Sequence, residues 1–297
     1  FFLGNGFKQI VDREDFVDPA FVGTWGASDE DMFNQLDRLL REDGDQPTFT
    51  LAFSVSNHSP WEYPAGRIQT DGNPATVENT VRYADWALGR FFEQAKRQPW
   101  YKDTLFVVVG DHGFGAPEQL TEMDLFRFHV PLLLIAPGVT EQFGSRREVV
   151  GTQVDVVPTI MGRLGGEVRH QCWGRDLLAL DERDPGFGII KPSGSDQTVA
   201  MIRGEQILVQ PKDLEPRLYR YRLGADASAQ RIEDADNAAS MLRQLQAYLQ
   251  VATGSLLANT AGDREREEPE TGQKLARAGG GHQVVLPAPG ARQPREG

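Results

Sequence analysis

The sequence predicts an α/β fold: a mostly parallel sheet flanked by helices, with a small antiparallel C-terminal subdomain. Residues 106–109 form an unbroken apolar run without polar alternation, which is typical of a strand buried on both faces. Segments favouring strand, helix and strand follow one another at 48–56, 76–96 and 106–109, which is the βαβ pattern of parallel sheets. After residue 186, short strands separated by Pro, Gly and Ser turns indicate an antiparallel meander.

These changes of character divide the chain into three parts. We expect residues 1–180 to form the α/β domain, and residues 181–258 to form the antiparallel strands with a closing helix. From residue 259 the chain is rich in Gly, Arg, Glu and Pro and poor in apolar residues, so residues 259–297 are predicted to be a disordered tail.

Two helices are predicted in the first hundred residues. Ser28 is followed by three acids and then by apolar residues at helical spacing as far as Arg41, so Ser28 is the expected N-cap. Residues 76–96 place apolar side chains on one face and charged side chains on the other, and Pro99 ends that helix.

The later elements follow from similar patterns. An apolar run after His129 predicts a third buried strand, whose direction the sequence leaves open. Pro158 is tolerated only in the first turn of a helix, so the helix ending at Leu164 is expected to begin at Asp155 or Val156. Strands are predicted at 187–190, 198–202, 206–209 and 218–221, and a helix at 237–251.

Composition narrows the classes of function. The chain has 297 residues and a formal net charge of −12, which argues against a nucleic-acid partner. The single cysteine, Cys172, excludes an internal disulfide and a cysteine-based zinc site. The chain begins at Phe1 without an initiator Met, a signal peptide or a run of about 18 apolar residues, so we expect it to be a piece of a longer protein.

Asp111 and His112 are the first candidate site residues. They directly follow the 106–109 strand, at the carboxyl end where open α/β sheets bind their ligands, and flanking glycines allow the chain to turn there. A carboxylate beside an imidazole suits Mn²⁺, Zn²⁺ or Mg²⁺. The alternative is a strand-end aspartate that caps a turn beside an incidental histidine.

His58 and Asn57 follow the predicted 48–56 strand in a loop that contains a proline, where functional residues concentrate. The alternative is that both satisfy backbone groups in a turn. His129 begins the third strand, so it lies at the Asp111 edge if that strand is antiparallel and at the opposite edge if it is parallel. We expect His58, Asp111 and His112 to converge at one rim of the sheet.

The sequence motifs around these residues resemble those of the alkaline phosphatase superfamily, in the sulfatase-like branch that contains lipoteichoic acid synthases and phosphoglycerol transferases. The resemblance covers about residues 1–180. It is carried by Gly-Thr-Trp-Gly at 23–26, Ser-Asn-His-Ser-Pro-Trp at 56–61, Val-Val-Gly-Asp-His-Gly at 108–113, His-Val-Pro-Leu-Leu at 129–133, Gln-Val-Asp-Val-Val-Pro-Thr at 153–159 and Gly-Arg-Asp-Leu-Leu at 174–178.

The resemblance implies an alkaline phosphatase-like fold, with residues 1–180 as the C-terminal part of a catalytic domain. It implies a metal-dependent phosphoglycerol transferase of the bacterial cell envelope. Asp111 and His112 then bind one divalent ion, manganese with zinc or magnesium as alternatives, and His58 contacts the phosphoryl group or the leaving oxygen. Asn57 and His129 are expected to contact a phospholipid or glycan substrate. The segments at 153–159 and 174–178 are expected to be structural.

One departure from the family pattern is important. Nothing in residues 1–50 matches the family's nucleophilic threonine or the acidic ligand that completes its metal site. We therefore expect this polypeptide alone to be inactive, and its parent to be an enzyme of the periplasm or cell exterior that is anchored by N-terminal helices. Two alternatives remain: a sulfuric-ester hydrolase of the same fold, and a non-catalytic binding module.

Overall fold

The computed structural model describes residues 2–115, 119–167, 169–192 and 197–258, so the predicted tail at 259–297 lies outside the described residues. The chain forms two compact units, Phe1–Thr104 and Leu105–Gly297. Each unit is described by itself below.

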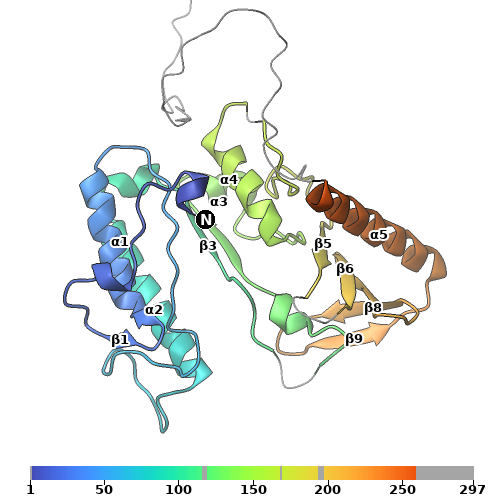
Figure 1. Ribbon diagram of the computed structural model, residues 1–297, viewed down its shortest axis with the longest axis horizontal. Helices are drawn as coiled ribbons and strands as arrows, with labels where there is room; N and C mark the ends of the chain where they lie inside the picture. Colours follow the sequence, from blue (N-terminus) through green and yellow to red (C-terminus); the bar gives the residue numbers. More distant parts are fainter. Residues whose placement is uncertain (1, 116–118, 168, 193–196, 259–297) are drawn as a thin grey trace, which may run out of the picture. The chain divides into compact units, whose positions relative to one another are not determined.

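The first unit is built on two helices that lie side by side, α1 (Asp29–Asp43) and α2 (Val77–Ala95) (Figure 1). Both helices were predicted from the sequence. Each begins after a capping residue, since the Ser28 and Thr76 side chains accept hydrogen bonds from backbone amides in the first turns. The remaining elements of this unit are η1 (Leu3–Asn5), η2 (Arg13–Asp15), β1 (Val22–Gly23), β2 (Gly26–Ala27) and η3 (Pro99–Asp103).

The prediction of a strand at 48–56 is wrong. Residues 47–55 have no regular secondary structure, and the side chains of Phe49, Leu51 and Phe53 are 67%, 48% and 61% exposed. A strand exists only where a neighbour completes its hydrogen bonds, and the local apolar pattern does not contain that information. In the described part of this unit, the two strands β1 and β2 pair only with each other.

The second unit begins with a pair of strands, β3 (Phe106–Val109) and β4 (Leu132–Ile135). They are antiparallel, with Phe106 opposite Ile135 and Val109 opposite Leu132. This settles the direction that the sequence left open. The elements around them are η4 (Leu125–Phe128), α3 (Val139–Phe143), η5 (Gln153–Asp155) and α4 (Val156–Leu164), whose start agrees with the position of Pro158 in its first turn.

A five-stranded antiparallel sheet completes the second unit and confirms the antiparallel meander predicted after residue 186, although its last strand was not predicted. Its strands follow chain order: β5 (Phe187–Ile190), β6 (Val199–Arg203), β7 (Gln206–Gln210), β8 (Arg217–Arg222) and β9 (Ser228–Arg231). Helix α5 (Ala235–Leu257) packs on β6 and β7. Figure 1 shows it lying along one side of this sheet.

Both faces of this sheet are covered. Leu208 packs with Met241 and Leu245 of α5, whereas its neighbours Ile207 and Val209 point to the opposite face. On that opposite face lie Met123 and Leu125, from the segment that follows the Asp111–His112 loop. The sheet therefore supports the chain that leads away from the predicted metal ligands.

The parallel sheet expected in the first 180 residues is not shown. Every ladder between named strands in the described ranges is antiparallel, and a parallel pairing occurs only as the isolated bridge between Val150 and Gly186. The predicted burial of β3 on both faces is also wrong: β3 and β4 are only partly buried, and Val109 is 38% exposed. An unbroken apolar run does not fix what covers a strand or the direction of its neighbour. Among the described residues, no helix is long and apolar enough to cross a membrane.

Candidate functional site

His58 lies exposed on the loop that follows Ser56, next to the equally exposed Asn57. Its ring Nδ1 is 2.9 Å from the backbone oxygen of Ser59. A carbonyl oxygen has no proton to give, so Nδ1 must carry the hydrogen of this bond. In the neutral ring, Nε2 is then the nitrogen with the lone pair.

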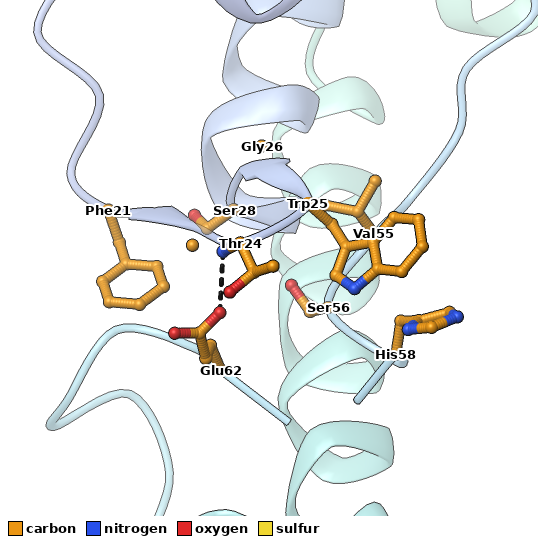
Figure 2. A pocket seen from close by; sticks show the side chains of 10 residues that line it. Phe21, Thr24, Trp25, Gly26, Ser28, Val55, Ser56, His58 and Glu62 are labelled. Atoms are coloured by element: carbon orange, nitrogen blue, oxygen red, sulfur yellow. Dashed lines mark hydrogen bonds between the residues drawn. The ribbon is translucent and has the colours of Figure 1, made fainter. Parts of the chain in front are cut away.

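The indole of Trp25 lies directly against this imidazole (Figure 2). The two ring centroids are 3.9 Å apart, with planes inclined by 48°. The indole Nε1–H donates to the same Ser59 oxygen at 2.7 Å. Trp25 therefore contacts His58 both through its ring and through a shared hydrogen-bond acceptor.

Helix α1 anchors the chain that leads to His58. The buried Asp29 carboxylate accepts hydrogen bonds from the amides of Val55 and Ser56, at 2.9 and 3.0 Å. On the other side of the loop, the Glu62 carboxylate accepts a hydrogen bond of 2.7 Å from the Thr24 amide, drawn in Figure 2. This bond lowers the pKa of Glu62.

These residues surround a small, open pocket on the first unit (Figure 2). An imidazole, an indole and a carboxylate face it, which is a mixed polar and apolar set suited to a polar organic ligand. The residues that line it are Phe21, Gly23, Thr24, Trp25, Gly26, Ser28, Val55, Ser56, His58 and Glu62.

In the second unit, Asp111 and His112 follow β3 and have side chains that are 73% and 70% exposed. The Asp111 Oδ2 and His112 Nε2 atoms are 3.7 Å apart. His112 Nδ1 lies 3.0 Å from the carbonyl oxygen of Gly113, so Nδ1 is the protonated nitrogen and Nε2 has the free lone pair. A backbone carbonyl commonly orients a metal-binding histidine in this way.

Hydrogen bonds to backbone groups hold this loop in place. The Gln153 side-chain amide donates to the carbonyl oxygens of Gly110 and Asp111, both at 2.8 Å. The Gly113 amide donates to Arg127 O at 2.8 Å, and a Cβ atom at Gly113 would lie 2.0 Å from Phe126 O. Only glycine fits at this close approach.

His129 shares this end of the β3–β4 pair. It follows η4 and precedes β4, and its backbone oxygen would lie 3.0 Å from a Cβ atom at Gly113. Because β4 is antiparallel to β3, His129 stands at the Asp111 edge, which is the placement that the sequence analysis gave for an antiparallel strand.

The Asp111 and His112 pair fits part of a metal site. Oxygen and nitrogen ligands bind Zn²⁺ at about 2.0–2.2 Å, so one ion can contact two donor atoms that are 3.7 Å apart. No group of three or more candidate ligands occurs within the ranges that the structure describes. The pair offers two donor atoms, whereas metal sites in proteins usually have three or four protein ligands.

The structure thus brings Asp111, His112 and His129 together in one unit, and places His58 and Asn57 in the other. The functional roles of all five stay predictions. Sequence reasoning did not find the anchoring contacts of Asp29 or Gln153. The signals were present, since Asp29 directly follows an N-cap serine and Gln153 begins one of the segments quoted above.

Comparison with known proteins gives a consistent result. A family model described as Sulfatase matches residues 1–166, more than half of the chain. The chain is 29% identical over 207 residues to the lipoteichoic acid synthase-like protein YvgJ of Bacillus subtilis, covering 63% of this chain and 33% of that protein. It is 26% identical over 216 residues to lipoteichoic acid synthase 2 of the same organism, covering 62% and 32%.

A further relative is phosphoglycerol transferase I of Salmonella typhi, 27% identical over 125 residues, covering 38% of this chain and 16% of that protein. The chain thus spans about a third or less of the length of these curated relatives. Among solved structures, a protein in the alkaline phosphatase superfamily from Vibrio parahaemolyticus aligns with a TM-score of 0.76 and 29% identity, over 87% of this chain and 62% of that one.

Proposed function

Because this chain belongs to the sulfatase family, we propose that it is part of a metal-dependent phosphoglycerol transferase of the bacterial cell envelope. Relatives named as lipoteichoic acid synthases and phosphoglycerol transferases support transfer of a phosphoglycerol group. The solved alkaline phosphatase superfamily protein supports the fold on which this chemistry would rest.

The observation that carries the proposal is the facing pair of donor atoms at the end of β3. Asp111 Oδ2 and His112 Nε2 are 3.7 Å apart, and the Gly113 carbonyl oxygen holds His112 in the tautomer that can bind a metal. We assign these two side chains as ligands of one divalent ion, manganese first, with zinc or magnesium as alternatives. Such an ion, when bound, supplies positive charge that stabilises a phosphoryl group during transfer.

The histidines outside the metal pair receive different roles. We assign His58 Nε2 as the group that contacts the phosphoryl oxygen or protonates the leaving oxygen, because its Nδ1 is already committed to Ser59 O. Asn57 and His129 are assigned to the substrate, a phospholipid or glycan. The nucleophilic threonine and the remaining metal ligands are assigned to another part of a longer, membrane-anchored protein whose catalytic domain faces the periplasm or the cell exterior.

A manganese titration tests the metal assignment. Mn²⁺ is paramagnetic and broadens the NMR signals of nuclei close to it, which detects weak binding as well as tight binding. Added to the chain, Mn²⁺ should broaden the His112 ring and Asp111 amide signals first, and Asp111→Ala should abolish this preference. His170→Ala, which changes another exposed histidine of the same unit, should leave it intact. Broadening that is equal in all three proteins would refute the assignment.

A second measurement uses the longer protein and separates the two chemistries of the family. Phosphoglycerol transfer from a phosphatidylglycerol donor should fall by about 10²–10⁴-fold on His58→Ala, the usual contribution of acid–base catalysis. An aryl sulfate should be a poor substrate. Turnover of the aryl sulfate in preference to the phosphodiester would instead establish the sulfuric-ester hydrolase.

A further inference from the structure

We propose that Trp25 is a positioning residue for His58, acting through the backbone carbonyl group of Ser59. This inference rests on the role proposed for His58 in phosphoryl transfer. Trp25 itself is not assigned a contact with the reacting atoms.

The shared carbonyl is the central observation. A carbonyl oxygen has two lone pairs, and the Ser59 oxygen accepts from Trp25 Nε1 at 2.7 Å and from His58 Nδ1 at 2.9 Å. Both rings are thus bound to one atom, and their centroids lie 3.9 Å apart. The imidazole cannot turn about its side-chain bonds without breaking its own hydrogen bond and leaving the indole face.

The indole is itself held by the chain around it. Residues 24–29 and 55–62, which are distant in sequence, are joined on both sides of Trp25. Thr24 N donates to Glu62, and Asp29 accepts from Val55 and Ser56. Trp25 stands between these contacts at the turn from β1 to β2. Its backbone is therefore held in place, and its indole keeps its position against the imidazole.

Packing alone does not account for the position of Trp25. The residue is 55% exposed and lines the pocket beside His58, whereas the buried aromatic Tyr83 of the same unit lies in the core. A large apolar side chain left this exposed gains little from burial. Its ordered contacts are instead with the functional histidine and with the acceptor of that histidine.

The chemical consequence concerns which nitrogen of His58 is available. With Nδ1–H directed to Ser59 O, Nε2 is the nitrogen left to accept a proton or, once protonated, to donate one to an oxygen of the substrate. Trp25 limits the directions in which Nε2 can point. Reactions that need a positioned proton donor lose rate steeply when the donor is displaced by about 1 Å.

NMR of the ring of His58 in the full 297-residue chain tests this directly. In the wild-type chain, the indole should shift the His58 ring protons upfield, and the neutral ring should be the Nδ1–H tautomer by its nitrogen shifts. Trp25→Ala should remove the upfield shift and mix the two tautomers. Trp25→Phe, which keeps an aromatic ring and loses Nε1–H, should retain part of the shift. Trp173→Phe, at an exposed tryptophan of the other unit, is the matched control and should change neither signal.

A titration with glycerol 3-phosphate separates this inference from the proposed function. If the ligand perturbs the His58 ring in the wild-type chain and equally in Trp25→Ala, His58 binds substrate without help from Trp25 and the positioning role is wrong. If Trp25→Ala alters the His58 tautomer but His58→Ala leaves phosphoglycerol transfer by the longer protein unchanged, the positioning holds and the proposed role of His58 fails. In the longer protein, Trp25→Ala should lower kcat by on the order of 10²-fold with KM nearly unchanged, whereas a loss confined to KM would overturn the inference.

Discussion

Asp155 shows how a single buried carboxylate joins distant parts of the second unit. Its side chain is 1% exposed and accepts from the Arg175 backbone amide at 2.6 Å and from the Arg175 guanidinium at 3.0 and 3.2 Å. Arg175 also donates to Phe187 O in β5, which agrees with the structural role expected for the segment at 174–178. Burial acts to raise the pKa of Asp155, but the Arg175 and Thr152 hydrogen bonds outweigh it, so the net pKa is lowered.

Asp155→Asn should therefore destabilise the protein by about 3 kcal/mol near neutral pH, because it leaves the Arg175 charge without its partner. The folded pKa of Asp155 lies below its ordinary value of 3.8, so the carboxylate contributes stability above that pH. The contribution is lost as pH falls through the folded pKa. Denaturant unfolding at several pH values should show the difference between wild type and variant shrinking below pH 3.8. Asp45→Asn, at an exposed site, should leave the free energy of unfolding near neutral pH within about 0.5 kcal/mol of wild type.

At the scale of single residues, the sequence indicates which side chains are candidate ligands better than it indicates which groups those side chains contact. The Gly-Asp-His-Gly sequence at 110–113 predicts that the two donors stand together after a strand, and the structure places them so. The acceptor that orients His112 is the carbonyl oxygen of Gly113. Every residue has a backbone carbonyl group, so the sequence does not indicate which one acts as the acceptor. The same is true of Ser59 O beside His58.

Substitution of two glycines, Gly89 in a helix and Gly113 in a loop, should have opposite effects on stability. Gly89 lies inside α2 with open space around it, so Gly89→Ala should stabilise the protein by about 0.5–1 kcal/mol through helix propensity. Gly113→Ala forces a Cβ atom against Phe126 O, so it should cost 2 kcal/mol or more, on the order of other severe backbone clashes. Urea unfolding of both variants measures the two effects. Equal effects of the two substitutions would contradict the close packing of the 110–115 loop.

Elements with their own end signals were predictable, and elements that depend on a distant partner were not. The helices α1 and α2 begin at Ser28 and Thr76, whose side chains cap them within one turn. The strand expected at 48–56 has apolar residues suited to a strand, as β3 has, yet β3 pairs with β4 whereas 47–55 has no regular structure. Strand formation is a property of pairs, and a local apolar pattern does not show whether a partner strand is present.

At the scale of the molecule, we expect the second unit to fold by itself. Its two apolar clusters lie on opposite faces of the five-stranded sheet, and every member comes from residues 123–249. Residues 105–258, expressed alone, should give dispersed NMR spectra and one cooperative unfolding transition. A chain of residues 105–258 without fixed tertiary structure would contradict this expectation.

Leu208→Ala, at a fully buried position of the five-stranded sheet, should lower the free energy of unfolding by about 2–5 kcal/mol.

The sequence predicted the meander and the helix that follows it, but it did not predict what covers the sheet face opposite α5. Met123 and Leu125 pack there, from a segment that local patterns placed with the Asp111 loop. Glu122 strengthens this attachment through Arg217 and through the Tyr219 hydroxyl, which donates to it at 2.9 Å. Such contacts join segments about a hundred residues apart, so no periodicity along the chain can indicate them.

The uncovered apolar side chains of Phe49, Leu51 and Phe53 affect how the purified protein will behave in concentrated solution. Extended segments with exposed apolar groups and unused amide hydrogens are templates on which copies of a chain can adhere. The net charge of −12 keeps copies apart through mutual repulsion. Raising the ionic strength shortens the range of that repulsion, so this protein keeps its colloidal stability best in dilute salt.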